Sequence, residues 1–95
     1  MTLEEKFAKF HAENPKVYRL FDRFAMEAVA AGRLILSAKL IFERIRWETT
    51  VITAGDEYKL NNNYHAYYAR LWMKRNPYMM VKFRTRAVRG DRIAA

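Results

Sequence analysis

A run of aromatic residues directly after three consecutive asparagines constrains the fold more than any other part of this chain. Its apolar members recur at positions i, i+3, i+4, i+7 and i+8, which are Tyr64, Tyr67, Tyr68, Leu71 and Trp72. This spacing predicts one buried face of a helix over residues 61–75, ended by Asn76 and Pro77. Asparagine is a favoured N-cap because its side chain accepts a hydrogen bond from a free backbone N–H group of the first turn. The basic residues of the segment lie off the aromatic face or at its end. We therefore expect the helix to pack by one side and to meet an anion with its N-terminus and its basic side.

The positive charge of the chain is concentrated in its C-terminal part. The chain has 95 residues, a formal net charge of +8 and an isoelectric point near 10.1. Residues 1–31 hold five basic and five acidic side chains, whereas residues 64–95 hold eight basic side chains and one acidic side chain. This asymmetry indicates a neutral scaffold joined to a cationic working half. The excess charge favours a polyanionic partner: nucleic acid first, then an acidic protein or an anionic membrane surface.

Length and composition restrict the chain to one soluble domain. A chain of 95 residues is short for two domains, and a hydrophobic content of 52% is ample for a core. The chain has no cysteine, which excludes disulfides and thiolate zinc sites and fits a reducing compartment. No signal-peptide h-region opens it, and its apolar runs are too short for a membrane span. We therefore expect one cytoplasmic domain over residues 1–95, with a basic, mobile tail from about residue 87 and no membrane partner.

Caps and apolar spacing predict three further helices. They cover residues 2–12, 15–31 and 38–48. Each begins after a favoured N-cap: Thr2, Asn14 and Ser37. Pro15 suits the first position of its helix, and Gly32 suits the position after the end of that helix. Two helices joined around Gly32 form a helix-turn-helix-like arrangement or a simple αα-hairpin. The expected fold class is mainly α, with about four helices in a helix-turn-helix or winged-helix-like domain.

Two short segments have strand character. Residues 49–53 are β-branched, a turn is expected at 54–57, and residues 58–60 suit a returning strand, so we predict a small β-hairpin between the third and fourth helices. An ordered loop is the alternative. After Pro77, the apolar Met79, Val81 and Phe83 alternate with basic residues, which indicates a strand with one apolar and one basic face. A helical turn is the alternative for so short a run.

The candidate nucleic-acid-binding residues come from the fourth helix and from a basic arm over residues 82–92. They are Asn61, Asn62, Asn63, His65, Arg70, Lys74, Arg75, Lys82, Arg84, Arg86 and Arg89. Asparagine pairs bidentately with adenine, and arginine makes forked contacts to phosphate or guanine. In the simpler interpretation the asparagines only cap the helix, the aromatics are core, and the arm keeps the protein soluble. We expect a non-catalytic protein that favours DNA, without cofactor or metal. A homodimer fits this interpretation, because helix-turn-helix proteins often pair across palindromic sites.

Catalytic alternatives are weaker. Glu57, Tyr58 and Lys59 match the E-x-K half of a metal-dependent nuclease site, for which Asp56 or Glu48 would have to supply the second carboxylate. Two histidines, His11 and His65, fall in separate predicted helices without a local carboxylate, serine or cysteine partner. The three glycines form no phosphate-binding loop.

The runs SAKLIFERIRWET and KLNNNYHAYYARLWMKRNP, with FRTR close behind, resemble a family of small proteins encoded by phages and prophages. The resemblance covers roughly residues 14–89. It implies a phage-linked host context and a small helical fold of helix-turn-helix type, and it implies no catalytic residues. A protein-interaction module, such as a phage-made inhibitor that docks on an acidic host surface, is therefore the alternative function.

Overall fold

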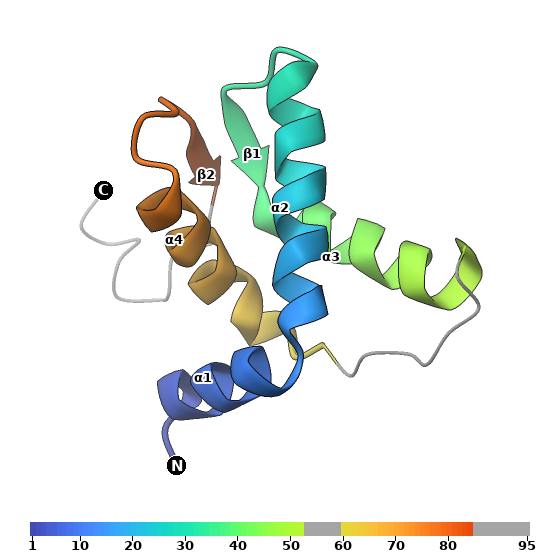
Figure 1. Ribbon diagram of the computed structural model, residues 1–95, viewed down its shortest axis with the longest axis vertical. Coiled ribbons are helices and arrows are strands. Elements are labelled where there is room, and N and C mark those ends of the chain that lie inside the picture. The colour runs from blue at the N-terminus through green and yellow to red at the C-terminus, as the bar shows by residue number, and fades with distance from the viewer. Residues whose placement is uncertain (53–59, 85–95) are drawn as a thin grey trace.

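The computed structural model describes residues 1–52 and 60–84, which form a mainly α-helical domain (Figure 1). Its elements follow in the order α1 (Leu3–Glu13), α2 (Pro15–Ala30), β1 (Ile35–Ser37), α3 (Ala38–Trp47), the π-helical turn η1 (Glu48–Ile52), the 3₁₀ turn η2 (Asn62–Tyr64), α4 (His65–Arg75) and β2 (Lys82–Arg84). The predicted mainly α class and the four predicted helices are confirmed. Within the described ranges, no helix combines the length and the apolar character needed to cross a membrane.

Helices α1 and α3 begin at the predicted caps. The Thr2 hydroxyl accepts a hydrogen bond from the Glu5 backbone N–H group at 3.1 Å, and the Glu5 carboxylate accepts one from the Thr2 N–H group at 3.0 Å. This reciprocal capping box satisfies two donors that a helix start leaves free. At α3, the Ser37 hydroxyl accepts from the Leu40 N–H group at 3.1 Å.

Asn14 differs from the prediction, although α2 begins where expected. Its side-chain amide donates to the Phe10 carbonyl at 3.0 Å, so it closes α1, and its side chain makes no capping bond to α2. Pro15 occupies the first turn of α2, where its missing N–H group leaves nothing unsatisfied. Gly32 follows the end of α2 with a φ of +89°, as predicted for that position.

A parallel pair of strands joins the two halves of the chain. Strand β2 was expected from the alternation after Pro77, but β1 was not predicted. The register pairs Ile35 with Lys82 and Leu36 with Phe83. Residues 31–37 connect α2 to α3 and include β1. This connection is longer than the turn of three or four residues typical of a helix-turn-helix. The helix-turn-helix assignment thus stays a prediction.

The predicted strand at residues 49–53 is wrong over its described part. Residues 48–52 continue from α3 as a π-helical turn, and the Thr49 hydroxyl donates to the Ile45 carbonyl at 2.9 Å. This hydrogen bond satisfies the hydroxyl of the β-branched Thr49 within a helical turn. The remainder of the predicted hairpin, up to residue 59, lies outside the described residues.

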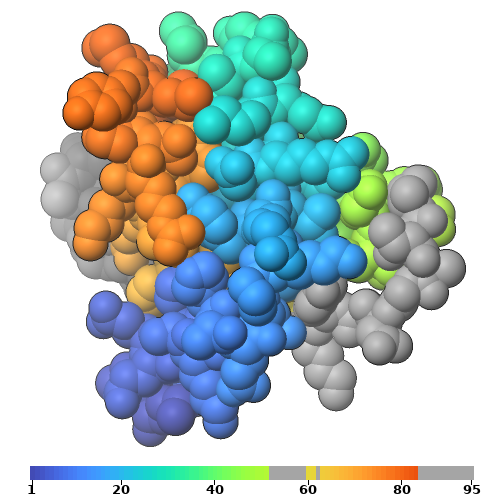
Figure 2. Space-filling view, viewed as in Figure 1, coloured from blue at the N-terminus to red at the C-terminus, as the bar shows by residue number. Residues whose placement is uncertain are grey.

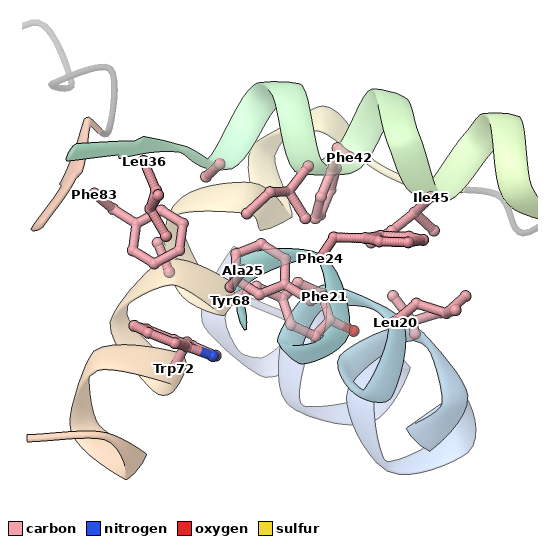
Figure 3. Close-up of a cluster of buried hydrophobic side chains, with 14 of the residues drawn as sticks. Leu20, Phe21, Phe24, Ala25, Leu36, Phe42, Ile45, Tyr68, Trp72 and Phe83 are labelled. Carbon is pink, nitrogen blue, oxygen red and sulfur yellow. The ribbon is translucent and has the colours of Figure 1, made fainter. Parts of the chain in front are cut away.

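The core lies where α2, α3, α4 and the sheet meet (Figure 3). Its largest fully buried side chains are Trp72, Tyr68, Phe21, Phe42, Ile45 and Val17. Helix α4 contributes Tyr68, Ala69 and Trp72, so the predicted aromatic face does hold this helix, while Leu71 is only half-buried. With one side of α4 fixed in the core, its opposite side faces outward.

Candidate nucleic-acid interface

The outward side of α4 carries two cations one helical turn apart. Arg70 and Lys74 are both exposed, at i and i+4, on the side opposite the buried Trp72. The Arg70 guanidinium carbon lies 5.5 Å from the centroid of the Tyr67 ring, a cation–π distance. The ring supports the arginine stem and leaves the charge at the surface.

Arg75 ends α4 and leans back onto α2. Its guanidinium carbon lies 4.6 Å from the centroid of the Tyr18 ring. Burial raises the pKa of the Tyr18 phenol, and the positive charge of Arg75 opposes that rise. Burial lowers the pKa of His11 in the same area, and the charge of Arg75 lowers it further. Arg75 is thus an exposed cation that the rest of the fold partly orients.

The end of α4 packs against β2, which carries a further cation. The Trp72 and Phe83 rings meet edge to face with their centroids 5.6 Å apart. Lys82 precedes Phe83 and is exposed on the outward side of the sheet. Figure 2 shows this part of the chain, in orange, as one flank of the molecule beside α2. The structure therefore places Lys74, Arg75 and Lys82 at the same end of the domain.

The asparagines lie at the other end of α4. The Asn61 side-chain oxygen accepts a hydrogen bond from the Asn63 N–H group at 2.9 Å, so Asn61 acts as the cap of η2, in agreement with the simpler interpretation. Asn62 follows within η2, and Asn63 is exposed. An eleven-residue helix is about 16 Å long, so this amide end and the cationic end of α4 form two separate surfaces.

His65 and the basic arm complete the predicted set. His65 is half-buried, with its ring edge-on to Phe42 at 6.0 Å between centroids, so it packs inward and not on the outer side of α4. Arg84 ends β2. Arg86 and Arg89, with the rest of the arm to residue 92, lie outside the described residues.

Four cations of α4 and β2 make no ion pair with a carboxylate of the described residues. All four ion pairs within the described ranges fall between residues 9 and 48: Lys9–Glu13, Arg23–Glu48, Arg44–Glu48 and Arg46–Glu43. In those ranges no carboxylate lies within ion-pair distance of Arg70, Lys74, Arg75 or Lys82. The sequence explains this, because no aspartate or glutamate occurs between residues 58 and 90. Among the described residues, no ion pair therefore compensates the positive charge of these four side chains.

The nuclease alternative finds little support in the described residues. Glu48 is buried and faces the guanidinium groups of Arg23 and Arg44 at 3.8 and 3.9 Å, so structural ion pairs occupy its carboxylate. Asp56, Glu57 and Lys59 lie outside the described ranges. No cluster of three or more histidine, aspartate or glutamate side chains suited to a metal ion occurs within those ranges.

Two surface features escaped sequence analysis. The side chains of Tyr78 and Met80, in the loop between α4 and β2, are 95% and 91% exposed. A hollow of about 290 Å³ lies beside β1, lined by Ala28, Arg33, Ile35, Leu36, Ser37, Leu40 and Ile41. The first feature had no signal in the sequence, because residues 78–81 are all apolar and show no alternation that separates Tyr78 and Met80 from their more buried neighbours. The second depends on β1, which was itself not predicted.

Comparison of the chain with protein-family models, with curated proteins and with solved structures finds no match in any of the three. The resemblance to phage proteins stays a prediction, and the functional proposal depends on the residues of this chain alone.

Proposed function

We propose that this protein is a small, non-catalytic nucleic-acid-binding protein that favours DNA. The observation that carries the proposal is the exposure of Arg70, Lys74 and Lys82 on the outward sides of α4 and β2, where no carboxylate of the described residues pairs with them. Each lysine or arginine that meets a phosphate releases condensed counterions, which supplies most of the affinity of such proteins. Helix α4 would face the nucleic acid, and the arm over residues 82–92 would follow the phosphate backbone.

The test is a fluorescence anisotropy titration of the full chain. Labelled duplex and single-stranded DNA and RNA of one sequence are titrated at several salt concentrations. We expect binding at low salt that weakens steeply as salt rises, because log K falls with log salt by about 0.9 per phosphate neutralised on duplex DNA and about 0.7 on a single strand.

A matched pair of triple variants locates the interface. The first variant changes three residues of the proposed interface to alanine: Arg70, Lys74 and Lys82. The second variant changes three exposed residues of α1 and α2 to alanine: Lys6, Lys16 and Arg19. Both variants lose one arginine and two lysines, so their net charges are equal. We expect the salt slope of the first to fall by about 2–3, in line with three lost phosphate contacts, and that of the second to fall much less. Absence of binding to every probe at low salt, or equal losses in the two variants, would overturn the proposal.

A protein-interaction module is the second candidate, and the hollow beside β1 favours it. Ile35 and Leu40 line this hollow and are 61% and 68% exposed, and Arg33 is its charged member. An acidic host protein with an apolar anchor would suit it, as would be expected of a phage-made inhibitor. Co-purification from host lysate separates the candidates: nuclease treatment leaves a direct protein complex intact and removes partners held through nucleic acid.

A further inference from the structure

The segment that links α4 to β2 alternates between inward and outward side chains. Val81 and Phe83 are buried at 7% and 8% exposure, and Met79 is half-buried against the core. Met80 and Lys82, which lie between these three residues, are exposed, and so is Tyr78, which precedes Met79. From Met79 to Phe83 this is the period of an extended chain with one side packed, whereas Tyr78 lies in the turn before it.

Backbone hydrogen bonds hold this segment in place. The Met79 N–H group donates to the Asn76 carbonyl at 3.2 Å, and the Val81 N–H group donates to the Met79 carbonyl at 2.6 Å. The Lys82 N–H group donates to the Leu34 carbonyl at 3.0 Å, which ties the segment to the chain just before β1. The exposed Tyr78 and Met80 are therefore carried by an anchored backbone.

Tyr78 is unusual among the tyrosines of this fold. Of the five in the described ranges, four pack against another aromatic ring: Tyr18, Tyr64, Tyr67 and Tyr68. Tyr78 makes no ring contact in those ranges and is 95% exposed. A tyrosine carries a large apolar face, and at this exposure the face of Tyr78 is open to a ligand.

The charges around Tyr78 indicate which ligand. Lys74 and Arg75 end the preceding helix, and Lys82 lies two residues beyond Met80. No acidic residue occurs in this part of the sequence. An exposed aromatic ring among cations is the arrangement with which proteins hold unpaired nucleotides, because the base stacks on the ring while the cations meet the phosphates. Bases within a duplex are already stacked and paired, so they cannot use such a ring without being unstacked.

We propose that Tyr78, which shares its exposed loop with Met80 and lies in the chain between Lys74 and Lys82, is a stacking surface for an unpaired base, and that single-stranded nucleic acid is the tighter ligand of this protein. The inference rests on the proposed function and names the form of nucleic acid that the cationic end of the domain selects. The two strand types, DNA and RNA, share this chemistry.

The test compares Tyr78→Ala and Tyr78→Phe with the unmodified chain by anisotropy, using single-stranded DNA, single-stranded RNA and a duplex of the same sequence. Loss of one base–aromatic stack lowers affinity by about tenfold or more, so we expect that loss for Tyr78→Ala on single strands. Tyr78→Phe keeps the ring and should bind within about twofold of the original. No charge is removed, so the salt slope should not change, and duplex binding should be unaffected.

Trp47→Ala is the matched control, because Trp47 is an aromatic residue, 55% exposed, at the end of α3 away from β2 (Figure 1). It should leave single-strand affinity unchanged. Circular dichroism of each variant verifies that the helices persist. Tighter binding to single-stranded DNA or to single-stranded RNA identifies which of the two strand types the protein prefers.

Three results would overturn the stacking surface while leaving the proposed function standing: tighter binding to duplex than to single strands, an unchanged affinity of Tyr78→Ala, or an equal loss in Trp47→Ala. A dimer that dissociates on Tyr78→Ala would also overturn it, since the ring would then serve a second copy of the chain. Absence of binding to every probe would instead overturn the proposed function itself.

Discussion

Trp72 is fully buried, yet its polar atom has a partner. The indole Nε1–H group donates to the Asp22 carboxylate at 2.8 Å, which links the cationic helix α4 to α2 across the core. A buried donor without an acceptor costs the free energy of desolvating it, whereas a satisfied one costs little. The position of α4, and with it the direction of its outward cations, therefore depends on this bond as well as on apolar packing.

Changing Asp22 to alanine should lower the free energy of unfolding by about 1–3 kcal/mol, because the indole N–H group is left unsatisfied inside the protein. Asp22→Asn should lose less, since its amide oxygen can still accept the bond. Urea denaturation measures the free energy of unfolding of both variants. Glu27→Ala is the control on the exposed side of the same helix and should change stability by no more than about 0.5 kcal/mol. Equal losses in Asp22→Ala and Glu27→Ala would show that the bond is not stabilising.

At the scale of elements, Gly32 determines how α2 ends. The Gly32 N–H group donates to the Val29 carbonyl at 2.9 Å, and the Arg33 N–H group donates to the Ala28 carbonyl at 3.0 Å. These two bonds form the Schellman motif, which needs a residue at positive φ. The φ of Gly32 is +89°, which sends the chain back toward β1.

Gly32→Ala should destabilise the protein by about 1–2 kcal/mol, because a residue with a Cβ atom is strained at positive φ. The loss arises in the backbone alone, since a Cβ atom at this position has nothing within 4 Å. Asparagine tolerates the left-handed region better, so Gly32→Asn should lose less. Thermal unfolding measures the stability of the original chain and of the two variants, and the expected order is glycine, then asparagine, then alanine. If alanine and asparagine were equally destabilising, a cause other than left-handed backbone strain would be required.

The helices were predictable because their signals are local. Thr2, Ser37 and Gly32 act within four residues of their own positions, and the aromatic face of α4 follows from spacing alone. Strand β1 was missed because a three-residue strand has no alternation to recognise and its partner β2 lies far along the sequence. The opposite error occurred at Thr49, where β-propensity favoured a strand, but the chain continues from α3 as a helical turn.

The candidate site was predictable to a similar degree. The outward positions of Arg70 and Lys74 follow from helical periodicity, once the aromatic side is assigned to the core. Sequence cannot show that Asn61 bonds to its own turn, nor that His65 lies against Phe42, because both depend on which side chain fills which space. The exposure of Tyr78 likewise depends on the path of the loop.

At the scale of the whole molecule, α1 is the least firmly held helix. None of its residues is buried, and it lies across the lower ends of α2 and α4 (Figure 1). Its contacts are mainly aromatic: the Phe7 ring lies 5.1 Å from the Tyr67 ring and 4.8 Å from the Tyr68 ring, centroid to centroid. Such a helix can detach while the remaining core stays folded.

His11 makes the attachment of α1 sensitive to acid. Its ring stacks on Phe7 and meets the Tyr68 ring edge-on, and its buried Nδ1 atom has no hydrogen-bond partner in the described residues. Burial lowers the pKa of His11, and the charge of Arg75 lowers it further. A histidine whose pKa is lower in the folded than in the unfolded chain gives stability that is present above its ordinary pKa of about 6.5 and is lost as the pH falls through the folded value.

We therefore expect the free energy of unfolding to fall as the pH is lowered from about 8 to 5, with α1 released before α2 and α4. Urea denaturation across this range measures the loss, and hydrogen exchange corrected for the intrinsic rate at each pH identifies the helix that opens. His11→Gln stays neutral throughout and should flatten the profile above the range in which carboxylates titrate. Parallel profiles for the two chains would mean that another group is responsible. Exchange that rises equally in α1 and α2 would mean that the domain opens as one unit and that α1 does not move independently.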